Sequence, residues 1–230
     1  MSESASVPVL TIDGPSGAGK GTVSARVAVE LGWNVLDSGA VYRSVAHAAL
    51  ERGVAVDDEA RLVELCGTLD LSFSPASDGV KACLNGRELG DALRSEEVGV
   101  MSSRVAAIPS VRRALLELQR SFRRPPGLVA DGRDMGTVVF EDAPVKVFLD
   151  ASVQERARRR HLQLKEKGES VTFDRLFRDL EARDRRDRER SVAPTLPAQD
   201  AVIVDSTSMS LDEVVARIIS LVRRSPILVP

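Results

Sequence analysis

A glycine-rich segment that ends in lysine places the strongest constraint on how this chain folds. Its sequence is Gly14-Pro15-Ser16-Gly17-Ala18-Gly19-Lys20, between a β-branched apolar run (7–12) and a stretch with apolar residues at helical spacing (22–31). Glycines allow several backbone N–H groups to approach one phosphate, and the positive end of the following helix faces the same anion. The G-x-x-x-x-G-K spacing between a strand and a helix therefore predicts a loop that binds nucleotide phosphates, with Lys20 reaching the β- and γ-phosphates.

The residue after this lysine departs from the usual pattern. It is Gly21, whereas the Ser or Thr that ligates Mg²⁺ in such loops usually follows the lysine directly; here the hydroxyl comes one residue later, at Thr22. Two arrangements remain open. Either Thr22 ligates Mg²⁺, or the ion is held through water and phosphate oxygens, which its slow dehydration favours. We expect ATP as co-substrate and Mg²⁺ as cofactor in both cases.

Composition excludes several classes of protein. The 230 residues carry a net charge of −2 and are only 3% aromatic, which argues against a protein that binds nucleic acid. Cys66 and Cys83 belong to no CxxC motif or Cys/His cluster, so a disulfide scaffold and a structural zinc site are not expected. No apolar run approaches the roughly 18 residues of a membrane span. The first residues also lack the features of a secretory signal, so we expect a cytoplasmic protein with no membrane partner.

Short apolar runs alternate with helical patterns along most of the chain. The patterns predict strands at 7–12, 33–36, 128–130, 145–149 and 202–204, and helices at 22–31, 40–52, 57–66, 96–106, 109–123, 152–167, 172–190 and from 210. Continuous apolar strands between helices are typical of a parallel sheet covered on both faces, so we expect the α/β class. Between 69 and 90 the pattern changes to short runs around Asn85-Gly86, which predicts a small antiparallel insert.

Positive charge concentrates in the two helices predicted between 151 and 190. This segment holds 13 Lys+Arg and 9 Asp+Glu, a net charge of +4 (13 − 9) in a chain whose total is −2. One interpretation is a helical hairpin with surface ion pairs. The other is a mobile lid that closes over ATP, with Gly168 between its helices. Arg183, Asp187 and Arg190 are spaced to share one helix face.

Other arginines follow turns or lie on helices, among them Arg43, Arg112 and Arg133. A guanidinium matches a phosphate with two parallel hydrogen bonds and is always charged. Taken alone, each of these residues is an ordinary surface arginine. Together they are what a second, phosphate-bearing substrate opposite the loop would need.

Several stretches together resemble bacterial cytidylate kinases. They are 12–22, Leu36-Asp37-Ser38-Gly39-Ala40-Val41-Tyr42-Arg43, Asp131-Gly132-Arg133-Asp134-Met135-Gly136-Thr137-Val138-Val139-Phe140, 142–146 and 183–194. The resemblance covers about residues 7–224, and the Asp131 to Gly136 motif separates it from adenylate kinases. It implies transfer of the γ-phosphoryl group of ATP to CMP or dCMP, giving CDP or dCDP and ADP. It also implies a nucleoside monophosphate kinase fold. A P-loop core (1–37, 107–150 and 191–230) would carry a nucleotide-monophosphate lobe (38–106, with the β insert at about 69–90) and a lid with its adjoining Arg-rich helix (151–190).

The resemblance also implies roles for single residues. ATP would be bound by Gly14, Pro15, Ser16, Gly17, Ala18, Gly19, Lys20, Gly21 and Thr22, with Arg159. The acceptor would be bound by Asp37, Ser38, Arg43, Ser103, Arg112, Asp131, Arg133, Asp134, Arg183, Asp187 and Arg190. Within this set, Arg43, Arg133 and Arg190 would hold the CMP phosphate. Ser103, Arg112 and Asp134 would read cytosine, and Arg183 and Asp187 would contact the sugar and the phosphate side. The catalytic groups would be Lys20, Arg133, Arg183 and Arg190.

The expected chemistry needs no covalent intermediate, because the acceptor phosphate is already an anion. Catalysis would consist of in-line positioning and neutralisation of charge by Lys20, Mg²⁺ and the arginines. Two alternatives remain: a P-loop kinase for another small acceptor such as UMP, shikimate or gluconate, and an ATP-binding module without turnover. We expect a monomer whose partners are small molecules.

Overall fold

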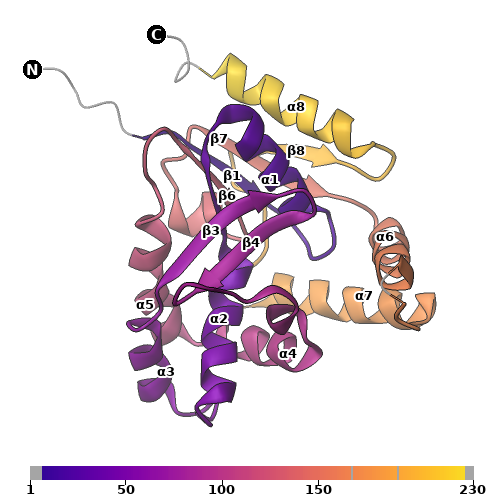
Figure 1. The fold of residues 1–230 in the computed structure, drawn as a ribbon. Helices are drawn as coiled ribbons and strands as arrows, with labels where there is room; N and C mark the ends of the chain where they lie inside the picture. The colour runs from indigo at the N-terminus through magenta and orange to yellow at the C-terminus, as the bar shows by residue number, and fades with distance from the viewer. Residues whose placement is uncertain (1–6, 167, 191, 226–230) are drawn as a thin grey trace, which may run out of the picture.

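The computed structural model describes residues 7–166, 168–190 and 192–225, and it has the predicted α/β architecture (Figure 1). Its main sheet has five strands in the order β2 (Asn34–Asp37), β6 (Leu128–Asp131), β1 (Val9–Asp13), β7 (Val145–Asp150) and β8 (Val202–Asp205). All of the neighbouring pairs are parallel. β1 and β6 are buried along their whole length because both lie inside the sheet and are covered on both faces.

The side chains of β1 alternate between two apolar clusters, one on each face of the sheet. Leu10 and Ile12 pack with α1 (Lys20–Leu31) and α8 (Leu211–Arg224) in one apolar cluster. Val9 packs in the other cluster, with α2 (Ser38–Glu51), α3 (Glu59–Cys66) and α5 (Pro109–Arg120). Successive side chains of a strand point to opposite faces, so a short apolar strand supplies both layers.

The predicted antiparallel insert is present. β3 (Leu71–Ala76), β4 (Gly79–Leu84) and the short β5 (Arg87–Glu88) form a three-stranded sheet. Asn85 and Gly86 both have positive φ, 51° and 76°, as the tight turn between β4 and β5 requires. Figure 1 shows β3 and β4 crossing α1, and the β-carbon of an alanine at Gly79 would lie 4.0 Å from the backbone nitrogen of Thr22. The insert therefore contacts the helix that follows the glycine-rich loop.

Several element boundaries differ from the sequence expectation. The helix predicted at 22–31 begins at Lys20, since the carbonyl oxygen of Gly19 already accepts from the backbone nitrogen of Val23 at 3.0 Å. The helix predicted at 109–123 ends at Arg120, and β5 precedes the run predicted around Leu89. The other helices are α4 (Glu96–Val105), α6 (Val153–Glu166) and α7 (Phe173–Glu189). Parts of the predicted segments, namely 1–6, 167, 191 and 226–230, lie outside the described residues. Within the described ranges, no helix combines the length and apolarity of a membrane span.

Candidate active site

Three aspartates end adjacent strands of the main sheet. Asp13, Asp37 and Asp131 are the last residues of β1, β2 and β6. Asp131 lies opposite Asp37 in one ladder and opposite Ile12 in the other. Parallel strands bring their carboxyl ends to one edge of a sheet, where α/β proteins bind their ligands. This edge carries the glycine-rich loop.

The loop is shaped by glycine and leaves a helix end open. At Gly14 φ is 146°, and an added β-carbon would lie only 2.0 Å from the carbonyl oxygen of Leu149. The backbone of the loop thus passes too close to β7 for any side chain. Gly19 offers no side-chain cap to α1, and the first turn of α1 holds no acidic residue in the structure as described. The free N–H groups and positive end of α1 therefore face the loop, which suits an anion.

The side chain of Lys20 folds back onto the glycine-rich loop that precedes it. Its Nζ donates to the carbonyl oxygen of Pro15 at 3.0 Å and lies 4.0 Å from Oδ1 of Asp131. Burial lowers the pKa of Lys20 to about 8, against the opposing effect of Asp131. Asp13 accepts from the backbone nitrogens of Met135 and Gly136, at 2.8 Å each, and burial raises its pKa to about 7. Asp13 thereby fixes the segment after β6 against the loop.

A cleft of about 530 Å³ opens beside the sheet edge. Side chains predicted for the acceptor line it from α2, α4, α5, the segment after β6 and α7; they are Ser38, Arg43, Ser103, Arg112, Arg133, Asp134, Arg183, Asp187 and Arg190. Tyr42 and Ser102, which the sequence analysis did not select, line it as well. Of the residues predicted for the acceptor, Asp37 and Asp131 lie at the strand ends and are not among the lining residues.

The arginines of this cleft are half-buried and only partly paired. Arg133 donates from Nε to Oδ2 of Asp187 at 2.5 Å. Nε of Arg183 and both Nε and Nη2 of Arg190 are buried, with no hydrogen-bond partner among the described residues. Burial lowers the pKa of Arg43 and of Arg190, and it lowers that of Arg183 to about 9. Buried cationic donors without partners are costly, so the cleft is complementary to an anion.

A second part of the cleft holds a carboxylate and a guanidinium together. Arg112 donates from Nη2 to Oδ2 of Asp134, and from Nη1 to the carbonyl oxygen of Ala106 at 3.2 Å. The guanidinium lies 5.6 Å from the ring centroid of Tyr42, a cation–π distance. Ser103 donates to the carbonyl oxygen of Gly99 at 3.1 Å. Donors and acceptors thus lie side by side, as recognition of a planar polar group requires.

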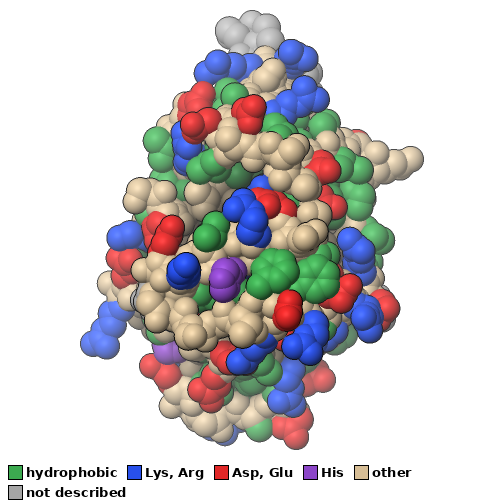
Figure 2. Space-filling model, turned by 90° about the vertical axis from the view of Figure 1, so that its right-hand side faces the viewer, with side chains coloured by type: hydrophobic (Ala, Val, Ile, Leu, Met, Phe, Trp, Pro, Cys, Tyr) green, Lys and Arg blue, Asp and Glu red, His purple; other side chains and the backbone are tan. Residues whose placement is uncertain are grey.

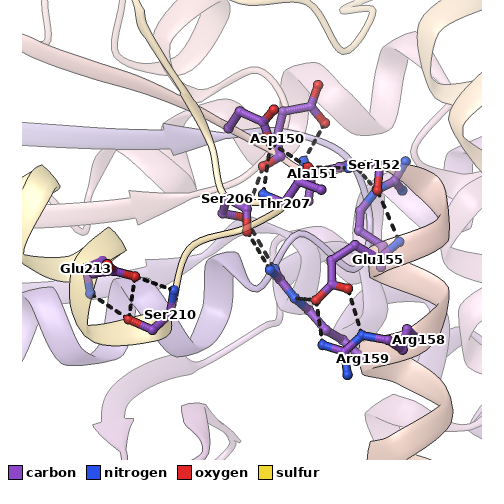
Figure 3. Close-up of polar contacts among 12 residues, drawn as sticks. Asp150, Ala151, Ser152, Glu155, Arg158, Arg159, Ser206, Thr207, Ser210 and Glu213 are labelled. Atoms are coloured by element: carbon purple, nitrogen blue, oxygen red, sulfur yellow. Dashed lines mark hydrogen bonds and ion pairs between the residues drawn. The ribbon is translucent and has the colours of Figure 1, made fainter.

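Of two further predicted residues, Ser38 lies in the cleft and Arg159 lies apart from it. Ser38 donates to Oε1 of Gln119 at 2.7 Å. Arg159 lies in the middle of α6, where its Nε donates to Glu155 at 2.8 Å and its Nη2 to the carbonyl oxygen of Ser206 at 2.6 Å (Figure 3). Arg159 therefore lies near the ends of β7 and β8, apart from the acceptor cleft. Its role toward ATP stays a prediction.

The face of the molecule in Figure 2 bears basic and acidic side chains interspersed. This face lies on the side where Figure 1 places α6 and α7. Ion pairs in these helices include Arg158 with Glu155 at 2.7 Å. The mixed signs contrast with the continuous basic surface on which nucleic acid binds.

The fold, with a glycine-rich phosphate loop and an arginine-lined cleft at one edge of the sheet, is that of a P-loop kinase. The family model described as cytidylate kinase matches residues 10–224. The cytidylate kinase of Aeromonas salmonicida is 56% identical over 213 residues, 93% of each chain. That of Methylococcus capsulatus is 56% identical over 217 residues, which is 94% of this chain and 97% of the relative. That of Yersinia enterocolitica is 54% identical over 220 residues, 96% of each chain. The chain belongs to the cytidylate kinase family, as its motifs predicted.

Proposed function

We propose that this protein transfers the γ-phosphoryl group of ATP to CMP or dCMP, giving CDP or dCDP and ADP. The single observation that carries the proposal is the position of the phosphate loop beside a cleft in which buried N–H groups of Arg183 and Arg190 have no partner among the described residues. Membership of the cytidylate kinase family supports the choice of acceptor. The phosphate loop and the arginine-lined cleft are adjacent, which supports direct transfer of a phosphoryl group from one bound phosphate to the other.

In this proposal the two halves of the site have separate tasks. The N–H groups at the start of α1 and the ammonium of Lys20 hold the ATP phosphates. Arg43, Arg133 and Arg190 hold the phosphate of CMP, and Arg183 with Asp187 faces the sugar. An oxygen of the CMP phosphate attacks in line and ADP leaves, so no side chain forms a bond to phosphorus. Because that oxygen is already anionic, no general base is needed, and the cationic side chains stabilise the transition state by their charge.

Cytosine is read by the pair in the second part of the cleft. The carboxylate of Asp134 accepts from the 4-amino group, and Arg112 donates to the ring carbonyl and N3. Their buried ion pair supports this role, because each group holds the other in a fixed orientation before the base arrives. Ser103 lines the same cleft.

One aspartate at the edge of the sheet, Asp131, lies beside the position that usually carries the hydroxyl ligand of Mg²⁺. An added β-carbon at Gly21 would lie 3.6 Å from Oδ2 of Asp131, so the position that usually carries the hydroxyl ligand faces a carboxylate instead. Carboxylate and phosphate oxygens are the ligands that Mg²⁺ takes, most often with several waters. We assign the ion to the ATP phosphates and Asp131, with Thr22 as the alternative. Bound there, Mg²⁺ supplies positive charge to the phosphates.

The experiment is ADP release from ATP and Mg²⁺ with CMP, dCMP, UMP, AMP or no acceptor. We expect rapid release with CMP and dCMP and little with the other three. Rapid release with UMP alone would point to the kinase for another acceptor. ATP binding without acceptor-dependent release would point to the module without turnover. A monomer and a cytoplasmic location are further parts of the proposal, and light scattering after gel filtration tests the first.

A further inference from the structure

The largest fully buried side chain among the described residues is charged. Arg156, on α6, is only 1% exposed. Neither the phosphate loop motif nor the acceptor set includes it. Burying a guanidinium is expensive unless its donors are all used, so its partners show what it does.

Its guanidinium joins three segments of the chain. Nε donates to the carbonyl oxygen of Ala151 at 2.9 Å, just after β7. Nη1 donates to the carbonyl oxygen of Ser16, inside the phosphate loop, at 2.8 Å. Nη1 and Nη2 donate to the two carboxylate oxygens of Asp184 on α7, at 3.1 and 2.5 Å. Such a bidentate pair fixes both the distance and the rotation of the carboxylate that it binds.

Apolar packing next to Arg156 also brings α7 against the phosphate loop. An added β-carbon at Gly17 would lie 3.4 Å from Cβ of Arg156 and 3.6 Å from Cδ2 of Leu180. Leu180 and Asp184 are one helical turn apart on α7, so a single face of this helix meets the loop. A small open hollow lies beside α7, lined by Pro15, Asp184 and Asp187 among others.

The same helix carries part of the acceptor cleft. Arg183 precedes Asp184 directly, Asp187 lies one turn further on, and Arg190 follows the end of α7. A shift or rotation of α7 would therefore move three groups of the acceptor cleft at once. The carbonyl oxygen of Ser16 and the carboxylate of Asp184 accept from the same guanidinium, so a movement of the loop relative to the helix would break one of these contacts.

We propose that Arg156 and Asp184 are a positioning pair that couples the phosphate loop to the acceptor cleft. ATP bound to the loop fixes the loop backbone, including the Ser16 carbonyl that accepts from Arg156. Through its bidentate pair with Asp184, Arg156 then fixes α7 and the groups that α7 contributes to the acceptor cleft. Neither residue needs to touch a substrate. The inference rests on the proposed function, because it concerns the two substrates named there. By linkage, ATP tightens CMP binding by the same factor as CMP tightens ATP binding.

The test is the affinity for CMP, measured by calorimetry with and without a saturating non-hydrolysable ATP analogue and Mg²⁺. We expect the analogue to tighten CMP binding at least about fivefold in the unmodified protein, a typical coupling. In Asp184→Asn and Arg156→Lys the factor falls toward one and kcat falls at least about tenfold, while the KM for each substrate changes less. The matched control is Arg158→Gln on the same helix, because Arg158 is exposed and pairs with Glu155; it should keep the coupling and the rate.

A double variant separates positioning from stability. Replacing a buried ion pair by apolar residues of similar volume often preserves stability. Arg156→Met with Asp184→Leu should therefore restore the thermal midpoint lost in the single variants without restoring the coupling. The proposal is overturned if this double variant regains the coupling, if the single variants keep it, or if the unmodified protein shows none. Absence of CMP-dependent ADP release in the unmodified protein would instead refute the proposed function, and the coupling proposal with it.

Discussion

Replacement of Asp134 by asparagine tests how the cleft recognises cytosine. The Asp134 side chain is buried in the cleft and pairs with Arg112. In the proposed function its carboxylate accepts from the 4-amino group of cytosine, whereas uracil would present a carbonyl oxygen to the same carboxylate. Asparagine keeps the shape but has both an acceptor and a donor, so its amide serves either base. We predict that Asp134→Asn loses most of the preference for CMP over UMP.

The magnitude follows from the burial and charge of this contact. A hydrogen bond to a charged group contributes about 1.5–3 kcal/mol. At 1.36 kcal/mol per factor of ten, kcat/KM for CMP should fall by roughly 10- to 150-fold. The value for UMP should rise, because the repulsion between two acceptors is removed. A site that binds a substrate N–H rejects the analogue lacking it by up to about 10⁴-fold. We expect the variant to retain a preference of no more than about tenfold.

The assay compares kcat/KM for CMP and UMP by ADP release in both proteins. Loss of the carboxylate leaves Arg112 without its charged partner, and breaking a buried ion pair costs about 3–5 kcal/mol. Thermal unfolding must therefore show that the variant is folded at the assay temperature. Asp142→Asn is the matched control, because Asp142 is exposed and pairs with Arg123 at 2.6 Å. An unchanged CMP/UMP ratio in a folded Asp134→Asn would refute the role of this residue.

Three further predictions concern the loop and the strand end before it. The pKa of Lys20, lowered to about 8, predicts that ATP affinity is level below pH 8 and falls by up to about tenfold per pH unit above it, in binding titrations. Gly14→Ala should abolish stable folding, because the new β-carbon would meet the Leu149 carbonyl; Gly99→Ala, with open space around it on α4, should leave the thermal midpoint equal or higher. Burial raises the pKa of Asp13 to about 7, so the protonated carboxyl stabilises the fold at low pH. This contribution to folding stability is fully present below about pH 4 and is lost as the pH rises to 7. Denaturant titrations from pH 5 to 8 should therefore show a flatter dependence in Asp13→Asn.

The sequence predicted the sheet well because its strands are short, apolar and ended by turn residues. β1, β6 and β7 all end in aspartate, within one residue of where the apolar run stops. The Asn85-Gly86 turn likewise predicted the insert, since few other residue pairs adopt two positive φ angles. Local chemistry was sufficient in these places. Nothing local, however, predicted that the hairpin would pack against α1, because that contact depends on backbone approach at Gly79.

The acceptor residues were predicted by resemblance to a family rather than by their own pattern. Arg183, Asp187 and Arg190 share a helical period, but so would residues of a solvated charged helix. Arg156 shows most clearly where prediction from the sequence alone fails. In the sequence it stands within Arg156-Ala157-Arg158-Arg159-Arg160 and looks like one member of a basic cluster. In the fold it is buried against the phosphate loop, while Arg158 is exposed. Only the packing of α6 against α7 separates the two.

Burial also decides what the arginines of the cleft can select. A guanidinium in water gains little from a phosphate, because water already satisfies its donors. In the cleft, the unpartnered N–H groups of Arg183 and Arg190 carry a penalty of about 1–3 kcal/mol each, which a bound anion removes. A nucleoside without its phosphate would leave the same donors unpaired, whatever its base. The cleft therefore selects its acceptor first by charge, through several arginines, and then by base, through Arg112 and Asp134.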